Sequence, residues 1–96
     1  MPTYITLLRW TTEGARDVKK SPSRLDAARR NFQSMGVTMR AFYMTTGRCD
    51  MVAVFEAPDD TTLAKALLST ISAGAVQTET MRAFTEDEYR SILGSL

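Results

Sequence analysis

The fold of this chain is decided around one stretch, Thr46-Gly47-Arg48-Cys49-Asp50-Met51-Val52-Ala53-Val54-Phe55-Glu56-Ala57-Pro58-Asp59-Asp60. Gly47 marks a tight turn, and residues 51–56 are apolar on both faces of a predicted strand. Asp50 lies where the turn becomes that strand. Pro58 and the two aspartates that follow it are typical of a helix start. A turn, a strand and a helix entry in direct succession indicate an α+β domain.

Residues that favour extended structure recur on both sides of this stretch. They predict three further strands, at residues 4–10, 37–45 and 76–84. Because successive side chains of a strand point to opposite faces of the sheet, we expect Met39, Ala41 and Tyr43 to share one face.

Two main helices are predicted between the strands. Ser21 is expected to cap the first helix, with Pro22 at the first helical position and Gly36 at the end. Apolar residues recur at helical spacing in both segments, which predicts one buried stripe on each helix. The stripes comprise Leu25, Ala28, Phe32 and Met35 in the first helix, and Leu63, Ala64, Leu67, Leu68 and Ile71 in the second, which Gly74 closes. Thr85 and Glu88 form a capping box, which predicts a short last helix.

These elements give the order β-α-β-β-α-β with an added C-terminal helix, the ferredoxin-like arrangement built on a four-stranded antiparallel sheet. With 96 residues, the chain is expected to form one domain over residues 1–96. Several strands carry large apolar side chains on both faces, whereas a sheet with one face in water alternates more cleanly. The two main helices cover only one face, so we expect a second copy of the chain to cover the other. Two sheets packed in this way would enclose a small cavity.

The composition excludes several kinds of chemistry. The chain has no histidine, which removes the commonest general base and metal ligand and the proximal ligand of many haem proteins. We therefore expect no metal site and no cofactor. The formal net charge of +1 gives no general attraction to nucleic acid or to anionic membranes, and no apolar run approaches the ~20 residues of a membrane-spanning helix. The one cysteine, Cys49, and the lack of a secretory signal predict a cytoplasmic protein.

Several segments of the sequence resemble the GYD-domain family. The resemblance is carried by residues 2–11, 21–29, 41–45, 56–60 and 78–88. The Gly, Tyr, Asp signature that names the family reads Gly47-Arg48-Cys49-Asp50 in this chain, with Cys49 where the family usually has tyrosine. The resemblance implies a dimeric α+β barrel, in agreement with the order of elements. It does not imply an activity, because related barrels include cofactor-independent monooxygenases, isomerases, haem enzymes and amino-acid-sensing domains.

The side chains that would line a cavity between two sheets are the first candidates for a binding site. We expect this lining to comprise Thr6, Trp10, Tyr43, Thr80 and Arg82. The aromatic rings can stack on a planar molecule, and the guanidinium group can bind an anion or a carbonyl oxygen. The leading hypothesis is that the protein binds a small organic molecule at the sheet–sheet interface. The opposite assignment of strand faces stays open.

Two alternatives use the same fold differently. In an enzyme of the cofactor-independent monooxygenase or isomerase kind, Asp50 or Tyr43 would supply acid–base chemistry and Arg82 would stabilise an enolate oxygen. Asp50 also has a structural interpretation, in which its carboxylate accepts backbone hydrogen bonds and fixes the turn. In a structural or interaction module, side chains would fill the cavity and no ligand would bind. All three hypotheses expect the chain to associate with copies of itself.

Overall fold

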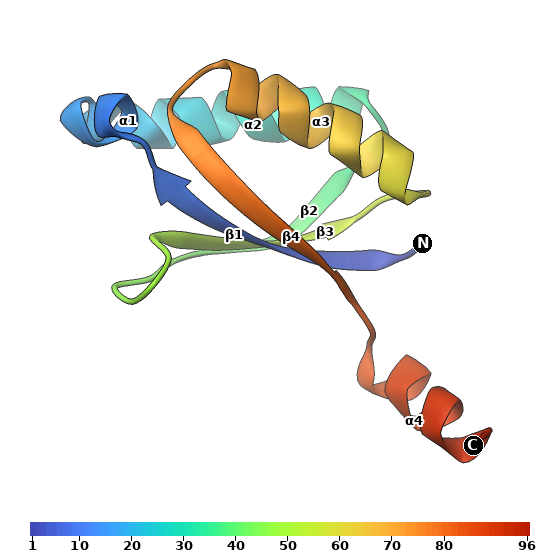
Figure 1. The fold of residues 1–96 in the computed structure, drawn as a ribbon. Helices are drawn as coiled ribbons and strands as arrows, with labels where there is room; N and C mark the ends of the chain where they lie inside the picture. Colours follow the sequence, from blue (N-terminus) through green and yellow to red (C-terminus); the bar gives the residue numbers. More distant parts are fainter.

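A computed structural model describes residues 1–96 of the chain. It has two layers, a four-stranded sheet with three helices on one face, and a fourth helix that extends beyond the end of the sheet (Figure 1). The strands are β1 (Thr3–Trp10), β2 (Thr38–Met44), β3 (Met51–Glu56) and β4 (Val76–Ala83). The helices are α1 (Thr12–Arg16), α2 (Ser21–Ser34), α3 (Asp60–Ser72) and α4 (Glu86–Gly94), with a 3-10 turn, η1 (Val18–Lys20), between α1 and α2.

The predicted α+β class and four-stranded antiparallel sheet are confirmed. The strands lie in the order β2-β3-β1-β4, and each neighbouring pair is antiparallel. β1 and β3 occupy the centre of the sheet, so their side chains on the helix-covered face are the most buried of all strand residues. These are Tyr4 and Thr6 in β1, and Met51, Ala53 and Phe55 in β3.

The helix ends follow the sequence signals with one exception. Gly36 and Gly74 adopt the left-handed backbone conformation after α2 and α3, with φ of +82° and +88°. Ser21, however, does not cap α2. The preceding residue, Lys20, is already helical because η1 runs directly into α2, so no extended residue turns a side chain onto the free backbone N–H groups. The Ser21 hydroxyl instead accepts a hydrogen bond from Trp10 Nε1 at 3.3 Å.

A β-bulge in β2 changes which side chains share a face of the sheet. The pairing of β2 with β3 shifts between Met39 and Ala41. Met39 therefore lies on the helix-covered face, whereas Ala41 and Tyr43 lie on the opposite face. The prediction that these three side chains share one face is wrong for Met39, because Arg40 is an extra residue in the bulge and breaks the alternation.

The hydrophobic core lies between the sheet and the two main helices. Phe32 of α2 meets Phe55 of β3 edge to face, with ring centroids 4.9 Å apart. The core comprises Tyr4, Phe32, Val37, Ala53, Phe55, Ala57, Leu63, Ala66 and Leu67. This packing holds α2 and α3 on one face of the sheet, and the other face has no helix over it (Figure 1).

Candidate functional site

The sheet face turned away from α2 and α3, which we call the open face, is the first candidate site. Two neighbouring rows of side chains cross all four strands on it, and seven of the eight are aliphatic or aromatic. The first row is Ala41, Val54, Ile5 and Met81, and the second is Tyr43, Val52, Leu7 and Glu79. Tyr43 is 64% exposed and Met81 is 43% exposed. A protein rarely keeps a contiguous apolar patch in water unless a partner covers it.

Charged side chains border these two rows. Arg40 forms an ion pair with Glu56 on one side of them, and Arg9 lies opposite Gln77 on the other side. An apolar centre with a polar rim is the usual composition of a protein–protein interface. The open face therefore has the chemistry of a docking surface.

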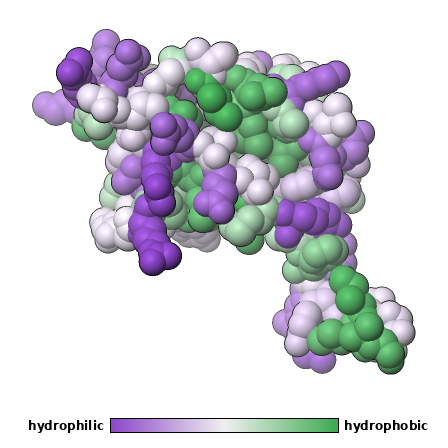
Figure 2. Space-filling model, viewed as in Figure 1, coloured by the Kyte–Doolittle hydropathy of each residue, from purple (hydrophilic) through white to green (hydrophobic).

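Helix α4 is a second apolar surface without cover. It stands apart from the two-layer body and contains no buried residue (Figure 1). Thr85 and Glu88 form the predicted capping box, and the backbone N–H of Thr85 lowers the pKa of Glu88 by hydrogen bonding to its carboxylate. The exposed apolar side chains of this end of the chain are Phe84, Tyr89, Ile92, Leu93 and Leu96. Figure 2 shows apolar side chains gathered on this protruding end.

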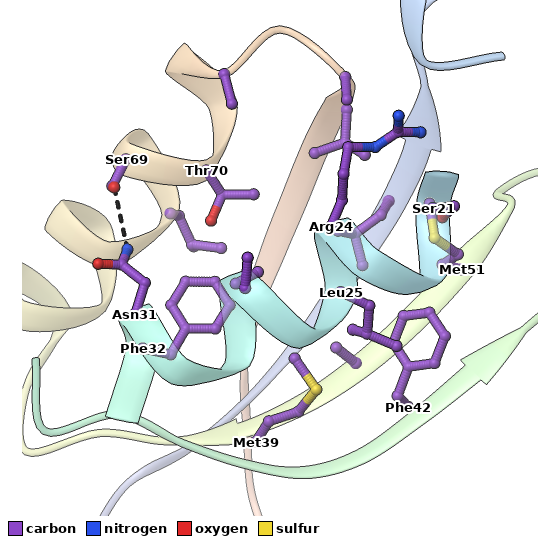
Figure 3. A pocket seen from close by; sticks show the side chains of 18 of the residues that line it. Ser21, Arg24, Leu25, Asn31, Phe32, Met39, Phe42, Met51, Ser69 and Thr70 are labelled. Atoms are coloured by element: carbon purple, nitrogen blue, oxygen red, sulfur yellow. Dashed lines mark hydrogen bonds between the residues drawn. The ribbon is translucent and has the colours of Figure 1, made fainter. Parts of the chain in front are cut away.

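A pocket opens on the helix-covered side, between α2 and α3, with a volume of about 330 Å³. Its floor is the sheet, and its walls come from the two helices (Figure 3). The apolar lining includes Leu25, Ala28, Phe32, Met39, Phe42 and Phe55. The polar lining comprises Ser21, Arg24, Asn31, Ser69 and Thr70. At one end, Asn31 Nδ2 of α2 donates a hydrogen bond to Ser69 Oγ of α3 at 3.1 Å.

A cluster of polar groups lies on the other side of α3, around the outer strand β4. The hydroxyl of Tyr4, a buried residue, donates a hydrogen bond to Asp60, and this bond raises the pKa of Tyr4 above its ordinary value. The Arg82 guanidinium lies over the rings of Tyr4 and Phe84, 5.8 and 4.5 Å from their centroids. Arg82 and Thr80 line a shallow pocket of about 240 Å³ beside Tyr4 and Asp60.

The structure divides the five expected pocket residues between the two faces of the sheet. Thr6, Thr80 and Arg82 are on the helix-covered face, where Thr6 Oγ1 and Thr80 Oγ1 are hydrogen bonded at 2.8 Å. Trp10 is on the same side and contacts α2 through Ser21, whereas Tyr43 is on the open face. The five side chains therefore do not line a single cavity.

The three candidates for catalysis are likewise not brought together. Asp50 Oδ2 accepts a hydrogen bond from the backbone N–H of Trp10 at 3.0 Å, and the backbone of Asp50 bonds to Leu8 and Thr45. Its carboxylate thus joins the turn to β1, as in the structural interpretation of this residue. Tyr43 and Arg82 lie on opposite faces of the sheet. The carbonyl oxygen of Cys49, a half-buried residue, accepts a hydrogen bond from Thr45 Oγ1 at 2.6 Å.

Sequence reasoning missed the pairing of Tyr4 with Asp60. A partial signal was present, because Tyr4 lies two residues before Thr6 and must share its face of the strand. Asp60 was identified only as part of a helix start. Their hydrogen bond joins residues 56 positions apart, so only the packing of α3 on the sheet could show it.

A protein-family model described as the GYD domain matches residues 4–93 of the chain. The chain belongs to the GYD-domain family. The resemblance inferred from the sequence segments is confirmed over nearly the whole chain. In this GYD-domain protein, Asp50 of the family signature binds the backbone of β1.

Two proteins of Thermus thermophilus are similar to this GYD-domain protein. One, a glutamine synthetase and cystathionine beta-lyase binding protein, is 38% identical over 84 residues, which cover 86% of this chain and 88% of the relative. The other is the crystal structure of TTHA0845, which matches with a TM-score of 0.56 and 24% identity. That match covers 88% of this chain and 95% of the solved chain, and it supports the fold.

Two further kinds of feature are absent from the structure. None of the helices combines the length and the apolar content needed to span a membrane. No group of three cysteine or acidic side chains lies close enough together to hold a metal ion.

Proposed function

We propose that this GYD-domain protein is a protein-binding module that pairs with a second copy through the open face and, as a dimer, binds a metabolic enzyme. The open face carries the proposal. Seven of the eight side chains in its two rows are apolar, and no helix of the chain covers them.

The energetic argument favours a second sheet as the cover. Each large aliphatic side chain that leaves water contributes about 1.5–3 kcal/mol. Ile5, Leu7, Val52 and Val54 are half-buried at the centre of the patch, so a second copy would gain part of this amount for each of them. A sheet packed on a sheet places two such inner faces about 10 Å apart and lets their side chains interdigitate.

The identity of the proposed enzyme partner comes from the relative. That protein is named for binding glutamine synthetase and cystathionine beta-lyase, and it aligns with 86% of this chain. We therefore propose that this protein binds the glutamine synthetase or the cystathionine beta-lyase of its own organism. The exposed apolar side of α4 is the surface we assign to this contact, because it is a second apolar surface that no other element of the chain covers.

The decisive experiment uses Val54→Lys, which places an ammonium group in the middle of the open face. In a single subunit the lysine stem can lie along the sheet and extend its charge into water, at a cost of less than ~1 kcal/mol. In a dimer the charge would be enclosed. The matched control is Gln33→Lys, which adds the same charge at an exposed position of α2.

The molar mass of each protein is measured by light scattering during gel filtration, and folding is checked by circular dichroism. We expect the native protein and Gln33→Lys to be dimers or larger, and Val54→Lys to be a folded monomer. A native protein that is monomeric at micromolar concentration would show that the open face does not pair with a second copy.

Enzyme binding is measured separately, by titrating immobilised glutamine synthetase and cystathionine beta-lyase with the native protein. We expect saturable binding to at least one enzyme, weakened by Leu93→Ser in α4 and unchanged by Gln33→Lys. If neither purified enzyme binds at protein concentrations up to the millimolar range, the proposed partner class is wrong.

A further inference from the structure

We propose that the pocket between α2 and α3 binds a carboxylic acid of about ten non-hydrogen atoms with an apolar body. This pocket lies on the helix-covered side of the sheet, so the proposal is independent of the open face and of any enzyme partner. The size of the pocket, its lining and its one charged group each support this assignment.

The size of the pocket fits a small ligand. Its volume is about 330 Å³, which at roughly 30 Å³ per water-sized group holds about ten such groups. The volume lies at the lower end of the range found for ligand pockets in proteins. Asn31 of α2 and Ser69 of α3 are hydrogen bonded at one end of the pocket, and the two helices leave its floor open between them (Figure 3).

The lining requires an apolar body. Fourteen of the 19 lining residues are hydrophobic, and small alanine side chains on the wall leave room beside larger ones on the floor. No buried side-chain nitrogen or oxygen of the protein lacks a hydrogen-bond partner. A ligand with several polar groups would lose hydrogen bonds to water and find no partners in the centre of this pocket.

The charge at one end of the pocket selects the head group. Arg24 lines this end, and its guanidinium donates hydrogen bonds to the backbone carbonyls of Asp17 and Gly14, each at 3.2 Å. These bonds use two of its five N–H donors. Arg40, Arg82 and Arg90 each form an ion pair with a glutamate, whereas Arg24 forms none.

Ser21 places a second donor at the same end. It lies one helical turn before Arg24 on α2 and also lines the pocket. Its oxygen accepts the hydrogen bond from Trp10 Nε1, which leaves the Ser21 O–H group to donate. A hydroxyl donor beside an arginine without an acidic partner fits one carboxylate.

The test is isothermal titration calorimetry of the full chain with octanoate and with 1-octanol. These two probes share an apolar body and differ in charge. We expect octanoate to bind with a dissociation constant in the micromolar to low millimolar range, and 1-octanol to bind about tenfold more weakly or worse. Equal affinities, or no binding of octanoate, would overturn the proposal.

Variants identify the charged contact. Arg24→Gln removes the positive charge and should weaken octanoate binding by about tenfold or more, the size expected for loss of a charge-assisted hydrogen bond. It should leave 1-octanol binding unchanged, and Arg24→Lys should restore part of the octanoate affinity. The matched control is Arg30→Gln on the same helix, whose side chain is exposed and does not line the pocket. An equal loss in Arg24→Gln and Arg30→Gln would mean that only net charge matters, which contradicts the proposed contact.

Two further variants locate the ligand. Ala28→Leu fills the pocket and should abolish binding of both probes, whereas Gln33→Lys, at an exposed position of α2 outside the pocket lining, should leave both affinities unchanged. Retention of octanoate binding by folded Ala28→Leu, or its loss in Gln33→Lys, would place the ligand elsewhere. If Ala28→Leu fails to fold, the comparison of Arg24→Gln with Arg30→Gln still decides the proposal.

Discussion

Replacing Gly14 by alanine tests the packing of α1 against Ala75, the residue before β4. A methyl group built on Gly14 would lie 2.0 Å from the carbonyl oxygen of Ala75. Ordinary van der Waals contact begins near 3.4 Å, so one of the two segments has to move by about 1.4 Å. The carbonyl of Ala75 cannot retreat freely, because it accepts the hydrogen bond from the backbone N–H of Thr11 at 3.0 Å.

Two effects of opposite sign act on the free energy of unfolding. Alanine in place of glycine within a helix stabilises it by about 1 kcal/mol. Overfilling a packed site costs about 1–3 kcal/mol, and stretching the bond from Thr11 costs about 0.5–1.5 kcal/mol more. The added methyl group clashes with backbone atoms, which cannot rotate away as a side chain can. The destabilisation from this clash should therefore exceed the gain in helix propensity. We expect Gly14→Ala to destabilise the protein by about 1–3 kcal/mol, which lowers Tm by roughly 5–20 °C for a domain of this size.

The assay is thermal unfolding followed by circular dichroism, with Gly47→Ala as the matched control. Gly47 has no atom within 4 Å of an added methyl group and no positive φ, so this variant should change the stability by less than ~1 kcal/mol. If Gly14→Ala is as stable as the native protein or more stable, the close approach of α1 to Ala75 does not exist in solution.

Three further predictions concern individual side chains. Asp50→Ala leaves the N–H of Trp10 without its acceptor and should lower the free energy of unfolding, measured in urea, by about 1.5–3 kcal/mol. Asp26→Ala, at an exposed position of α2, should change this free energy little. Equal effects of the two substitutions would contradict the role of Asp50 in the turn. The pKa of Glu88 is lowered by its bond from the backbone of Thr85, so the cap stabilises α4 fully above pH 4.5 and loses this effect as the pH falls through the lower pKa of the folded state. Amide NMR shifts of α4 should report this loss, and Glu88→Gln should remove the pH dependence. The pKa of Tyr4 is raised by its bond to Asp60, so one of the three tyrosines should form tyrosinate at a higher pH than the others in an absorbance titration, and Tyr4→Phe should remove that late component.

Much of the fold could be predicted because its signals are local. Gly36 and Gly74 end the two main helices through their own backbone freedom, and Thr85 with Glu88 forms a cap within one turn. The two wrong predictions, the faces of β2 and the cap of α2, also have local causes, but the pattern of apolar and polar residues does not show them. Arg40 in its bulge reversed the faces of β2, and η1 removed the capping role of Ser21.

The candidate site was predicted less well than the fold. Thr6, Thr80 and Arg82 lie on one face of the sheet, because strands of an antiparallel sheet alternate in step. The sequence does not show whether this face lies under α2 and α3. Both faces of the central strands are apolar, so either face could be the one that the helices cover.

By itself, the sequence determined the order of strands and helices, most of their ends and the membership of the GYD-domain family, because each depends on neighbours in the chain or on matched segments. Only the tertiary structure decided which face of the sheet stays open, that Tyr4 bonds to Asp60, and that α2 and α3 leave a pocket with Arg24 at its end. These features join residues far apart in the chain. Their geometry depends on how α2 and α3 pack on the sheet, which is determined by the sizes of side chains that are distant in the sequence. A local sequence pattern does not contain this information.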